Sequence, residues 1–228
     1  MKIVLSGYQM HLLFMKNANF TYSFVVLIVF HFAGFCGLLS PYSSLFMLLT
    51  PFNLMLSAVL LWRHHVSEVK PLIYFFGFTF TLGFFVEYLG ANFGFLFGSY
   101  SYGDTLGIKL LNVPIVIGLN WMMIIYSIAT VLDRTSISIW AKVTVGSALA
   151  VFMDWLIEPI AIRYDFWSWE QGAIPLQNYF GWLITSAVML AAYYLFKVES
   201  KNRLALPLYI VQASFFAFLQ LGNFILRG

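Results

Sequence analysis

The chain has 228 residues, of which 61% are hydrophobic and only 9% are charged. A soluble domain carries roughly a quarter of charged residues, so this composition excludes an ordinary soluble protein and predicts an integral membrane protein. The net charge of +3 is small and spread along the chain, which argues against nucleic acid as a partner, and the single cysteine, Cys36, excludes an intramolecular disulfide.

Seven apolar segments, each near the roughly 20 residues that a bilayer requires, predict an all-α, polytopic membrane bundle. They cover about residues 20–39, 42–62, 71–91, 113–132, 138–162, 180–197 and 207–226. The first two are joined at Ser40-Pro41 and are expected to form a hairpin, and Pro51 is expected to kink the second. No long linker interrupts the series, so residues 1–228 are predicted to form a single integral-membrane domain.

The basic residues indicate how such a bundle would lie in the membrane. With seven crossings, one face would hold nine of the twelve, namely Lys2, Lys16, Arg63, Lys70, Arg134, Lys142, Lys197, Lys201 and Arg203. The other face would hold Lys109, Arg163 and Arg227. The positive-inside rule then predicts a cytoplasmic (inner) membrane protein with a cytoplasmic N-terminus, and it places the long loops 92–112 and 163–179 toward the outer face.

The fifth segment is unusual because it carries two acids, Asp154 and Glu158, in its second half. A spacing of four residues puts both carboxyl groups on one face of a helix. Acidic side chains are costly in hydrocarbon, and in membrane segments they usually face a bundle interior and mark a functional site. We therefore expect this pair to face an internal pocket.

The two long loops are rich in aromatic residues, and their pattern indicates an internal repeat. Glu87-Tyr88 corresponds to Asp154-Trp155, and Tyr100-Ser101-Tyr102 corresponds to Trp167-Ser168-Trp169, in both cases 67 residues later. Trp121 and Trp182 each follow a proline by seven residues. These matches predict a parallel repeat of the third and fourth segments by the fifth and sixth, with halves at about 71–132 and 138–197.

A parallel repeat would bring Glu87, Asp154 and Glu158 to a similar depth, beneath two aromatic loops. This arrangement predicts a lidded pocket with these three acids as the catalytic residues. The residues predicted to contact the substrate are Tyr88, Tyr100, Tyr102, Trp121, Trp155, Trp167, Trp169, Asn178 and Trp182.

Carboxyl groups that share a low-dielectric site cannot all carry a charge, so at least one is expected to be protonated at neutral pH. A carboxylic acid in an apolar pocket can protonate the double bond of an isoprenoid, and aromatic faces can stabilise the resulting tertiary cation. Asp154 or Glu158 would donate the proton, and Glu87 with the remaining acid would position water. Capture by water gives a tertiary alcohol, whereas capture by a neighbouring double bond gives a ring, so the residues alone leave both a hydratase and a cyclase open.

Three other classes compete with this chemistry: a metal site, a proton-coupled transporter and a retinal receptor. The four histidines, His11, His31, His64 and His65, show no spacing that favours a metal site, so neither a metal nor another cofactor is predicted. A proton-coupled transporter also uses intramembrane acids and repeats, but it needs a polar path to both faces, whereas these acids lie toward one. A retinal receptor is disfavoured because the last segment contains no lysine.

Two stretches carry a family resemblance: EYLGANFGFLFGSYSYGDTLGIKLLNVPIVIGLNWMMIIYS and ALAVFMDWLIEPIAIRYDFWSWEQGAIPLQNYFGW. Over about residues 80–190, the chain resembles the carotenoid biosynthesis family of membrane hydratases, which includes the CruF-type carotenoid 1′,2′-hydratases and the bisanhydrobacterioruberin hydratases. The stretch Leu106-Gly107-Ile108-Lys109 departs from the family in lacking an expected proline.

The resemblance implies that water is added, without a redox cofactor, to the terminal double bond of an acyclic carotenoid such as lycopene or γ-carotene. It also implies contact with membrane lipid and association with other enzymes of the carotenoid pathway. It assigns no catalytic residues. The choice of Glu87, Asp154 and Glu158 therefore rests on the free-energy cost of placing acidic side chains in a membrane.

Overall fold

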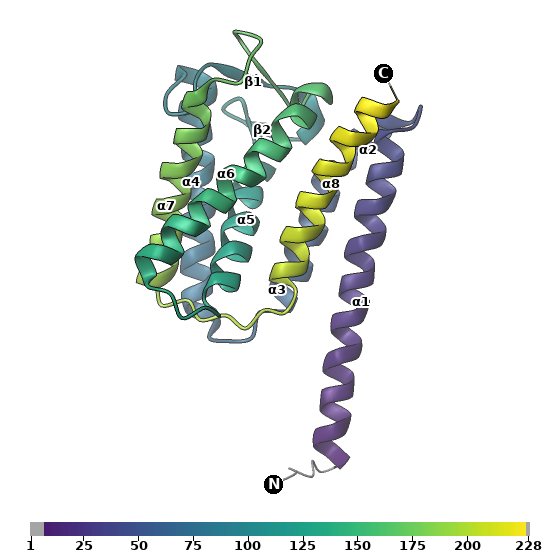
Figure 1. Cartoon of the computed structure of the whole chain (residues 1–228), viewed down its shortest axis with the longest axis vertical. Coiled ribbons are helices and arrows are strands. Elements are labelled where there is room, and N and C mark those ends of the chain that lie inside the picture. Colours follow the sequence, from purple (N-terminus) through teal and green to yellow (C-terminus); the bar gives the residue numbers. More distant parts are fainter. Residues whose placement is uncertain (1–6, 227–228) are drawn as a thin grey trace.

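The computed structural model describes the backbone of residues 7–226 and the side chains of residues 19–226. This part of the chain is mostly helical (Figure 1). Its helices are α1 (Gly7–Leu38), α2 (Ser43–Leu48), α3 (Thr50–Arg63), α4 (Val69–Phe93), α5 (Val116–Leu132), α6 (Ile139–Arg163), α7 (Leu176–Leu195) and α8 (Ala205–Ile225).

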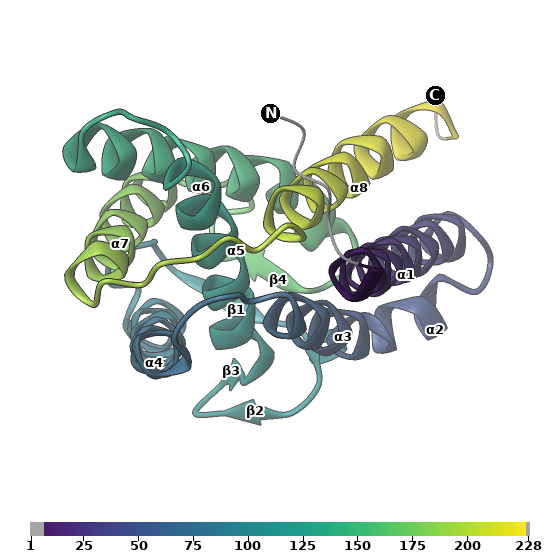
Figure 2. The same cartoon turned by 90° about the horizontal axis from the view of Figure 1, so that it is seen from below.

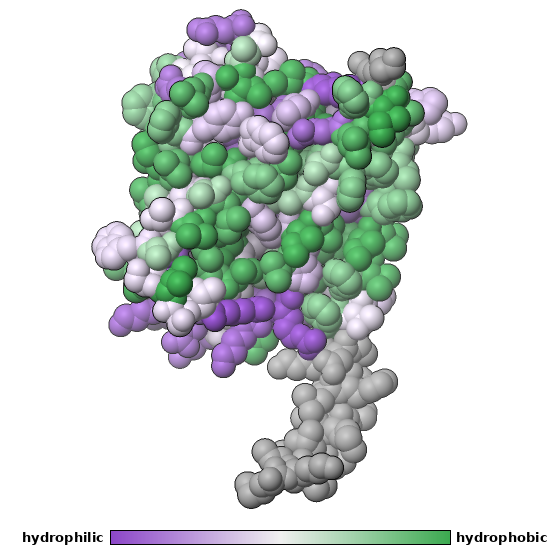
Figure 3. Space-filling model, in the orientation of Figure 1, coloured by the Kyte–Doolittle hydropathy of each residue, from purple (hydrophilic) through white to green (hydrophobic). Residues whose placement is uncertain are grey.

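Four helical stretches are long and apolar enough to cross a membrane, namely Asn19–Leu38 of α1 and the helices α4, α6 and α8. The helix α5 is also apolar but has only 17 residues. A broad hydrophobic band covers the visible face of the molecule, and hydrophilic side chains gather at its lower end (Figure 3). These features fit a multi-pass membrane protein. Each predicted segment contains a helix, but the count of seven crossings stays a prediction.

The second predicted segment is two helices rather than one kinked helix. The helix α2 ends at Leu48 and α3 begins at Thr50, so the chain breaks at Leu49. Pro51 lies in the first turn of α3. A proline lacks the backbone N–H that a helix interior requires, but the first turn makes no use of that group. Pro51 therefore begins a helix here and does not bend one.

The all-α prediction missed two small sheets, which lie in and next to the two long loops. The strand β1 (Tyr100–Tyr102) pairs antiparallel with β4 (Trp167–Trp169), and Ser101 lies opposite Ser168. A second pair joins β2 (Lys109–Leu110) and β3 (Val113–Pro114). The two aromatic triplets that match in sequence thus become partners in one sheet. Alternate residues of a strand point to opposite faces, which explains why aromatic residues alternate with serine.

The helix α5 forms the centre of the bundle, and Figure 2 shows α3, α4, α6, α7 and α8 arranged around it. It is buried along most of its length because it is apolar on all sides. The helix α4 approaches it closely at Gly83, where an added Cβ would lie 2.8 Å from the Cβ of Trp121. This close contact fixes the position of the Trp121 indole, which belongs to the site described below.

We expect Gly83→Ala to lower the thermal unfolding temperature in detergent micelles, because overpacking a close contact typically costs about 1–3 kcal/mol. Gly77→Ala provides the matched control on the same helix. An added Cβ there meets no atom within 4 Å, so this change should be neutral or slightly stabilising. Equal unfolding temperatures for the two variants would contradict the close approach of α4 and α5.

Candidate functional site

Three acids line one small cavity at the end of the bundle where β1 and β4 lie. Glu87 comes from α4, and Asp154 and Glu158 come from α6. None is more than 6% exposed. The cavity has a volume of about 30 Å³, which is room for about two water molecules. The sequence expectation that the three acids share one pocket therefore agrees with their positions.

Glu87 accepts hydrogen bonds from three side chains. The Trp121 indole N–H donates to its Oε1 at 2.8 Å, and the Tyr102 hydroxyl donates to its Oε2 at 2.7 Å. The Tyr100 hydroxyl also donates to Oε2. This contact requires Gly90 one turn along α4, because a Cβ there would lie 2.8 Å from the Tyr100 hydroxyl oxygen. Both oxygens of Glu87 are therefore occupied.

Glu158 is held in a similar way by the other strand. The indole N–H groups of Trp169 and Trp167 donate to its Oε2 at 2.9 and 3.2 Å. The Asn178 amide, from the first turn of α7, donates to its Oε1 at 3.1 Å. Each strand therefore supplies two aromatic donors to one buried acid, β1 to Glu87 and β4 to Glu158.

Asp154 differs from the other two acids. The Asn178 amide also donates to its Oδ2, at 2.7 Å, so one amide joins Asp154 to Glu158. The other oxygen, Oδ1, is buried and has no hydrogen-bond partner within the described part of the chain. Asp154 is 0% exposed. An unpartnered buried polar atom is unfavourable, so this oxygen is available to hydrogen-bond a molecule in the cavity.

The paired strands aim the aromatic side chains of β1 and β4 at the acids. Tyr100 contacts Trp169 with ring centroids 5.1 Å apart, while the Ser101 and Ser168 hydroxyl groups lie 3.3 Å apart on the outer face. Burial, followed by the nearby Glu87 carboxylate, raises the pKa of the Tyr100 and Tyr102 hydroxyls well above the usual tyrosine value. Both therefore remain protonated donors at neutral pH.

Seven of the nine predicted contact residues line the acid cavity, namely Tyr100, Tyr102, Trp121, Trp167, Trp169, Asn178 and Trp182. Trp121 and Trp182 stack with centroids 3.9 Å apart. Tyr88 and Trp155 lie elsewhere: Tyr88 packs on Phe93, and Trp155 is 52% exposed. Each follows an acid by one residue, which turns its side chain by about 100° around the helix and away from the cavity.

Sequence reasoning missed four residues that line the cavity: Phe97, Ile117, Asn120 and Ile157. Ile157 could have been found, because it lies three residues after Asp154 and so shares its helical face. The others carry no local signal. Phe97 follows the end of α4, and Ile117 and Asn120 lie near the beginning of α5, whose mostly apolar sequence marks no single face.

A comparison with known protein families covers the part of the chain that forms this site. Residues 42–226 match the family model described as carotenoid biosynthesis protein. The chain belongs to the carotenoid biosynthesis family. The matched region contains all three acids and both aromatic strands of this family member.

A more specific relative is the bisanhydrobacterioruberin hydratase of Haloarcula japonica, which is 26% identical over 111 residues. The match covers 45% of this chain and 38% of that protein. No solved structure matches this family member.

The described residues contain no group of three or more histidine, cysteine, aspartate or glutamate side chains placed to hold a metal ion. His31 lies in α1, and His64 and His65 follow α3. The side chain of His11 is outside the described residues. The absence of a metal or another cofactor stays a prediction for this carotenoid biosynthesis protein.

The hydrogen bonds to Glu158 predict different effects for two tryptophan substitutions. Trp169→Phe removes a donor from a buried acid and should lower the stability of the protein in detergent by about 1–3 kcal/mol. Trp155→Phe makes the same change at an exposed position and should stay within about 0.5 kcal/mol of the wild type. Thermal unfolding of both variants tests this difference, and a larger loss for Trp155→Phe would contradict the assignment of donors.

Proposed function

We propose that this carotenoid biosynthesis protein is a hydratase of the hydro-lyase type. It adds water to the terminal carbon–carbon double bond of an acyclic carotenoid end group, as in lycopene or γ-carotene, without a cofactor. The observation that carries the proposal is the Oδ1 atom of Asp154, which is buried and unpartnered within the described residues although Asp154 lines a cavity. Family membership and the distant hydratase relative support the substrate class.

The three acids take different roles because their hydrogen bonds differ. Glu87 accepts three donors and serves as a positioning residue that holds Tyr100, Tyr102 and Trp121 in place. Asp154 acts as the proton donor, since its Oδ1 is free to reach a substrate. Glu158 lies within reach of the same Asn178 amide and receives the proton released by water.

The reaction needs neither oxidation nor reduction. The Asp154 carboxylic acid transfers its proton to the terminal double bond, whose π electrons form the new C–H bond and leave a tertiary carbocation. A water oxygen then forms the C–O bond, and its excess proton passes to Glu158 and returns to Asp154. The stacked indoles of Trp121 and Trp182 present aromatic faces that stabilise the cation. The product is a tertiary alcohol.

The size of the acid cavity supports water as the group that captures the cation. About 30 Å³ admits one or two water molecules beside the acids, but it leaves little room for a second segment of polyene to fold back as a cyclase requires. Carboxylate and amide groups at the wall can hold such a water by hydrogen bonds.

The membrane arrangement belongs to the same proposal. We place seven segments across a cytoplasmic (inner) membrane, with the N-terminus in the cytoplasm and the acid-bearing ends of α4 and α6 toward the outer face. The helix α1 begins and the helix α8 ends at opposite ends of the bundle, which supports an odd number of crossings (Figure 1). The pairing of β1 with β4 supports a parallel repeat within a single domain. Lipid surrounds this domain, and other enzymes of the carotenoid pathway exchange substrate with it.

The proposal predicts the mass of the pigment in a host that makes lycopene. The wild-type chain should give a product heavier by one water with a tertiary hydroxyl group. Asp154→Asn should reduce its formation by about 10²–10⁴-fold, because the amide cannot donate a proton as an acid does. Asp104→Asn is the matched control, since the Asp104 side chain is fully exposed. Mass spectrometry of extracted pigment, with protein amounts equalised by immunoblot, measures both.

The Glu158→Gln variant should also form little product. The main effect of Glu87→Gln should instead be a lower amount of folded protein. A product of unchanged mass would indicate a cyclase. Unaltered pigment in cells that contain well-folded wild-type protein would overturn the hydratase for this substrate. Full activity of Asp154→Asn would overturn its role as proton donor.

A further inference from the structure

A second, larger cavity lies beside the acid cavity. It has a volume of about 260 Å³, and its mostly apolar wall comes from α1, α2, α3, α5, α6 and α8. The two cavities share four lining residues, namely Ile117, Asn120, Ile157 and Trp167. The acid cavity, at about 30 Å³, is too small for a polyene. The proposed reaction therefore needs the end of the substrate to reach the acids from the larger cavity, past these four residues.

Among the four shared residues, Asn120 is the one with free hydrogen-bonding groups. Ile117 and Ile157 are apolar, and the Trp167 indole N–H already donates to Glu158 at 3.2 Å. The side chain of Asn120 makes no hydrogen bond within the described part of the chain. An asparagine in a membrane helix commonly joins two helices by a hydrogen bond. Asn120 joins none, so its amide is available to a molecule at the junction of the cavities.

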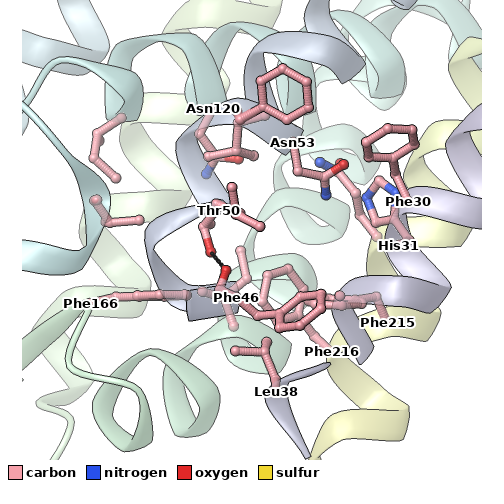
Figure 4. A pocket seen from close by; sticks show the side chains of 18 of the residues that line it. Phe30, His31, Leu38, Phe46, Thr50, Asn53, Asn120, Phe166, Phe215 and Phe216 are labelled. Carbon is pink, nitrogen blue, oxygen red and sulfur yellow. Dashed lines mark hydrogen bonds between the residues drawn. The ribbon is translucent and has the colours of Figure 1, made fainter. Parts of the chain in front are cut away.

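The side chain of Asn120 borders open space although its helix is central. Five other helices surround α5 (Figure 2), yet Asn120 is only partly buried, because it lines both cavities. In the view of Figure 4, Asn120 lies on the same side of the larger cavity as Asn53 and His31, and Phe46 and Phe166 lie on the other. An amide at this junction can reach a small molecule placed between the substrate and the acids.

The orientation of an attacking water depends on where its two hydrogens point. A lone pair of the water oxygen must face the carbocation, so both O–H groups need acceptors that lie away from it. The Asn120 amide oxygen can accept one, and the Glu158 carboxylate can accept the other. Glu158 receives three donors, from Trp167, Trp169 and Asn178. A carboxylate has about four acceptor sites, so one remains for water.

Asn178, the other amide of the acid cavity, is less suited to this role. Its amide nitrogen donates to both Asp154, at 2.7 Å, and Glu158, at 3.1 Å, and it does not line the larger cavity. Asn178 therefore holds the two acids in place. Asn120 is the amide that borders both the acids and the space from which the substrate arrives.

We propose that Asn120 is a positioning residue that holds the attacking water at the junction of the two cavities and so determines that the cation becomes an alcohol. This proposal rests on the proposed function and deepens it. After Asp154 has protonated the double bond, the held water forms the C–O bond and passes a proton to Glu158. Without that water, a C–H bond next to the cation breaks instead. Its electrons form a carbon–carbon double bond, its proton goes to Glu158, and the product is a hydrocarbon.

The test separates protonation from capture by running the reaction in D₂O. Purified protein in lipid nanodiscs is incubated with lycopene, and mass spectrometry measures the alcohol and the deuterated hydrocarbon. The Asp154 carboxyl group exchanges its proton with D₂O, so each protonation delivers deuterium to the chain. Asn120→Leu should lower the ratio of alcohol to deuterated hydrocarbon about tenfold, which is the effect of one hydrogen bond, while deuterium incorporation continues. Asn19→Leu, at an exposed position of α1, should keep the wild-type ratio.

A second variant, Asn120→Val, removes the same amide with a smaller side chain, and size-exclusion chromatography shows which variants are folded. A wild-type ratio in either folded variant would overturn the role of Asn120. So would the loss of deuterium incorporation together with the alcohol, which is the result expected from disturbed packing or substrate binding. Failure of both variants to fold would overturn it as well, because a residue that only holds water is not needed for folding.

The same experiment distinguishes this role from the proposed function. A wild-type protein that forms neither alcohol nor deuterated hydrocarbon would overturn the hydratase itself and, with it, the role of Asn120. A wild-type protein that hydrates lycopene, beside Asn120 variants with an unchanged ratio, would overturn the role of Asn120 alone.

Discussion

The structure of the site depends on hydrogen bonds from β1 and β4 to two buried acids. A carboxyl group inside a membrane bundle is costly unless its oxygens are hydrogen-bonded. Here the donors are phenol and indole groups, which are apolar except at one atom. They can therefore fill an apolar interior and still satisfy Glu87 and Glu158. The pairing of the two strands and the burial of the acids therefore depend on each other, because the paired strands carry the donors that the buried acids need.

The two halves of the predicted repeat differ in which acid their strand aromatics contact. In the first half, the strand aromatics donate to Glu87. In the second half, they donate to Glu158, one turn beyond Asp154, which is the residue that matches Glu87 in sequence. The position that matches Glu158 in the first half is Ala91. The second half thus carries one acid more than its donors occupy, and Asp154 is the acid left with an unpartnered oxygen within the described residues.

The sequence was sufficient for features that repeat at a regular spacing. Residues four apart on a helix and two apart on a strand share a face, so Asp154 with Glu158, and Tyr100 with Tyr102, could be assigned to one pocket before the fold was known. Tyr88 was misplaced by the same reasoning, because a match between repeats says nothing about direction. The short strands were missed since their three-residue length gives too little pattern, and pairing across 67 residues is a tertiary property.

The larger cavity shows what no spacing can reveal. His31, Asn53 and Gln212 lie on α1, α3 and α8, and each appears in its own segment as an isolated polar residue that could equally join two helices. Only the packing of these helices around α5 brings the three together and leaves the Oδ1 of Asn53 unpartnered within the described residues.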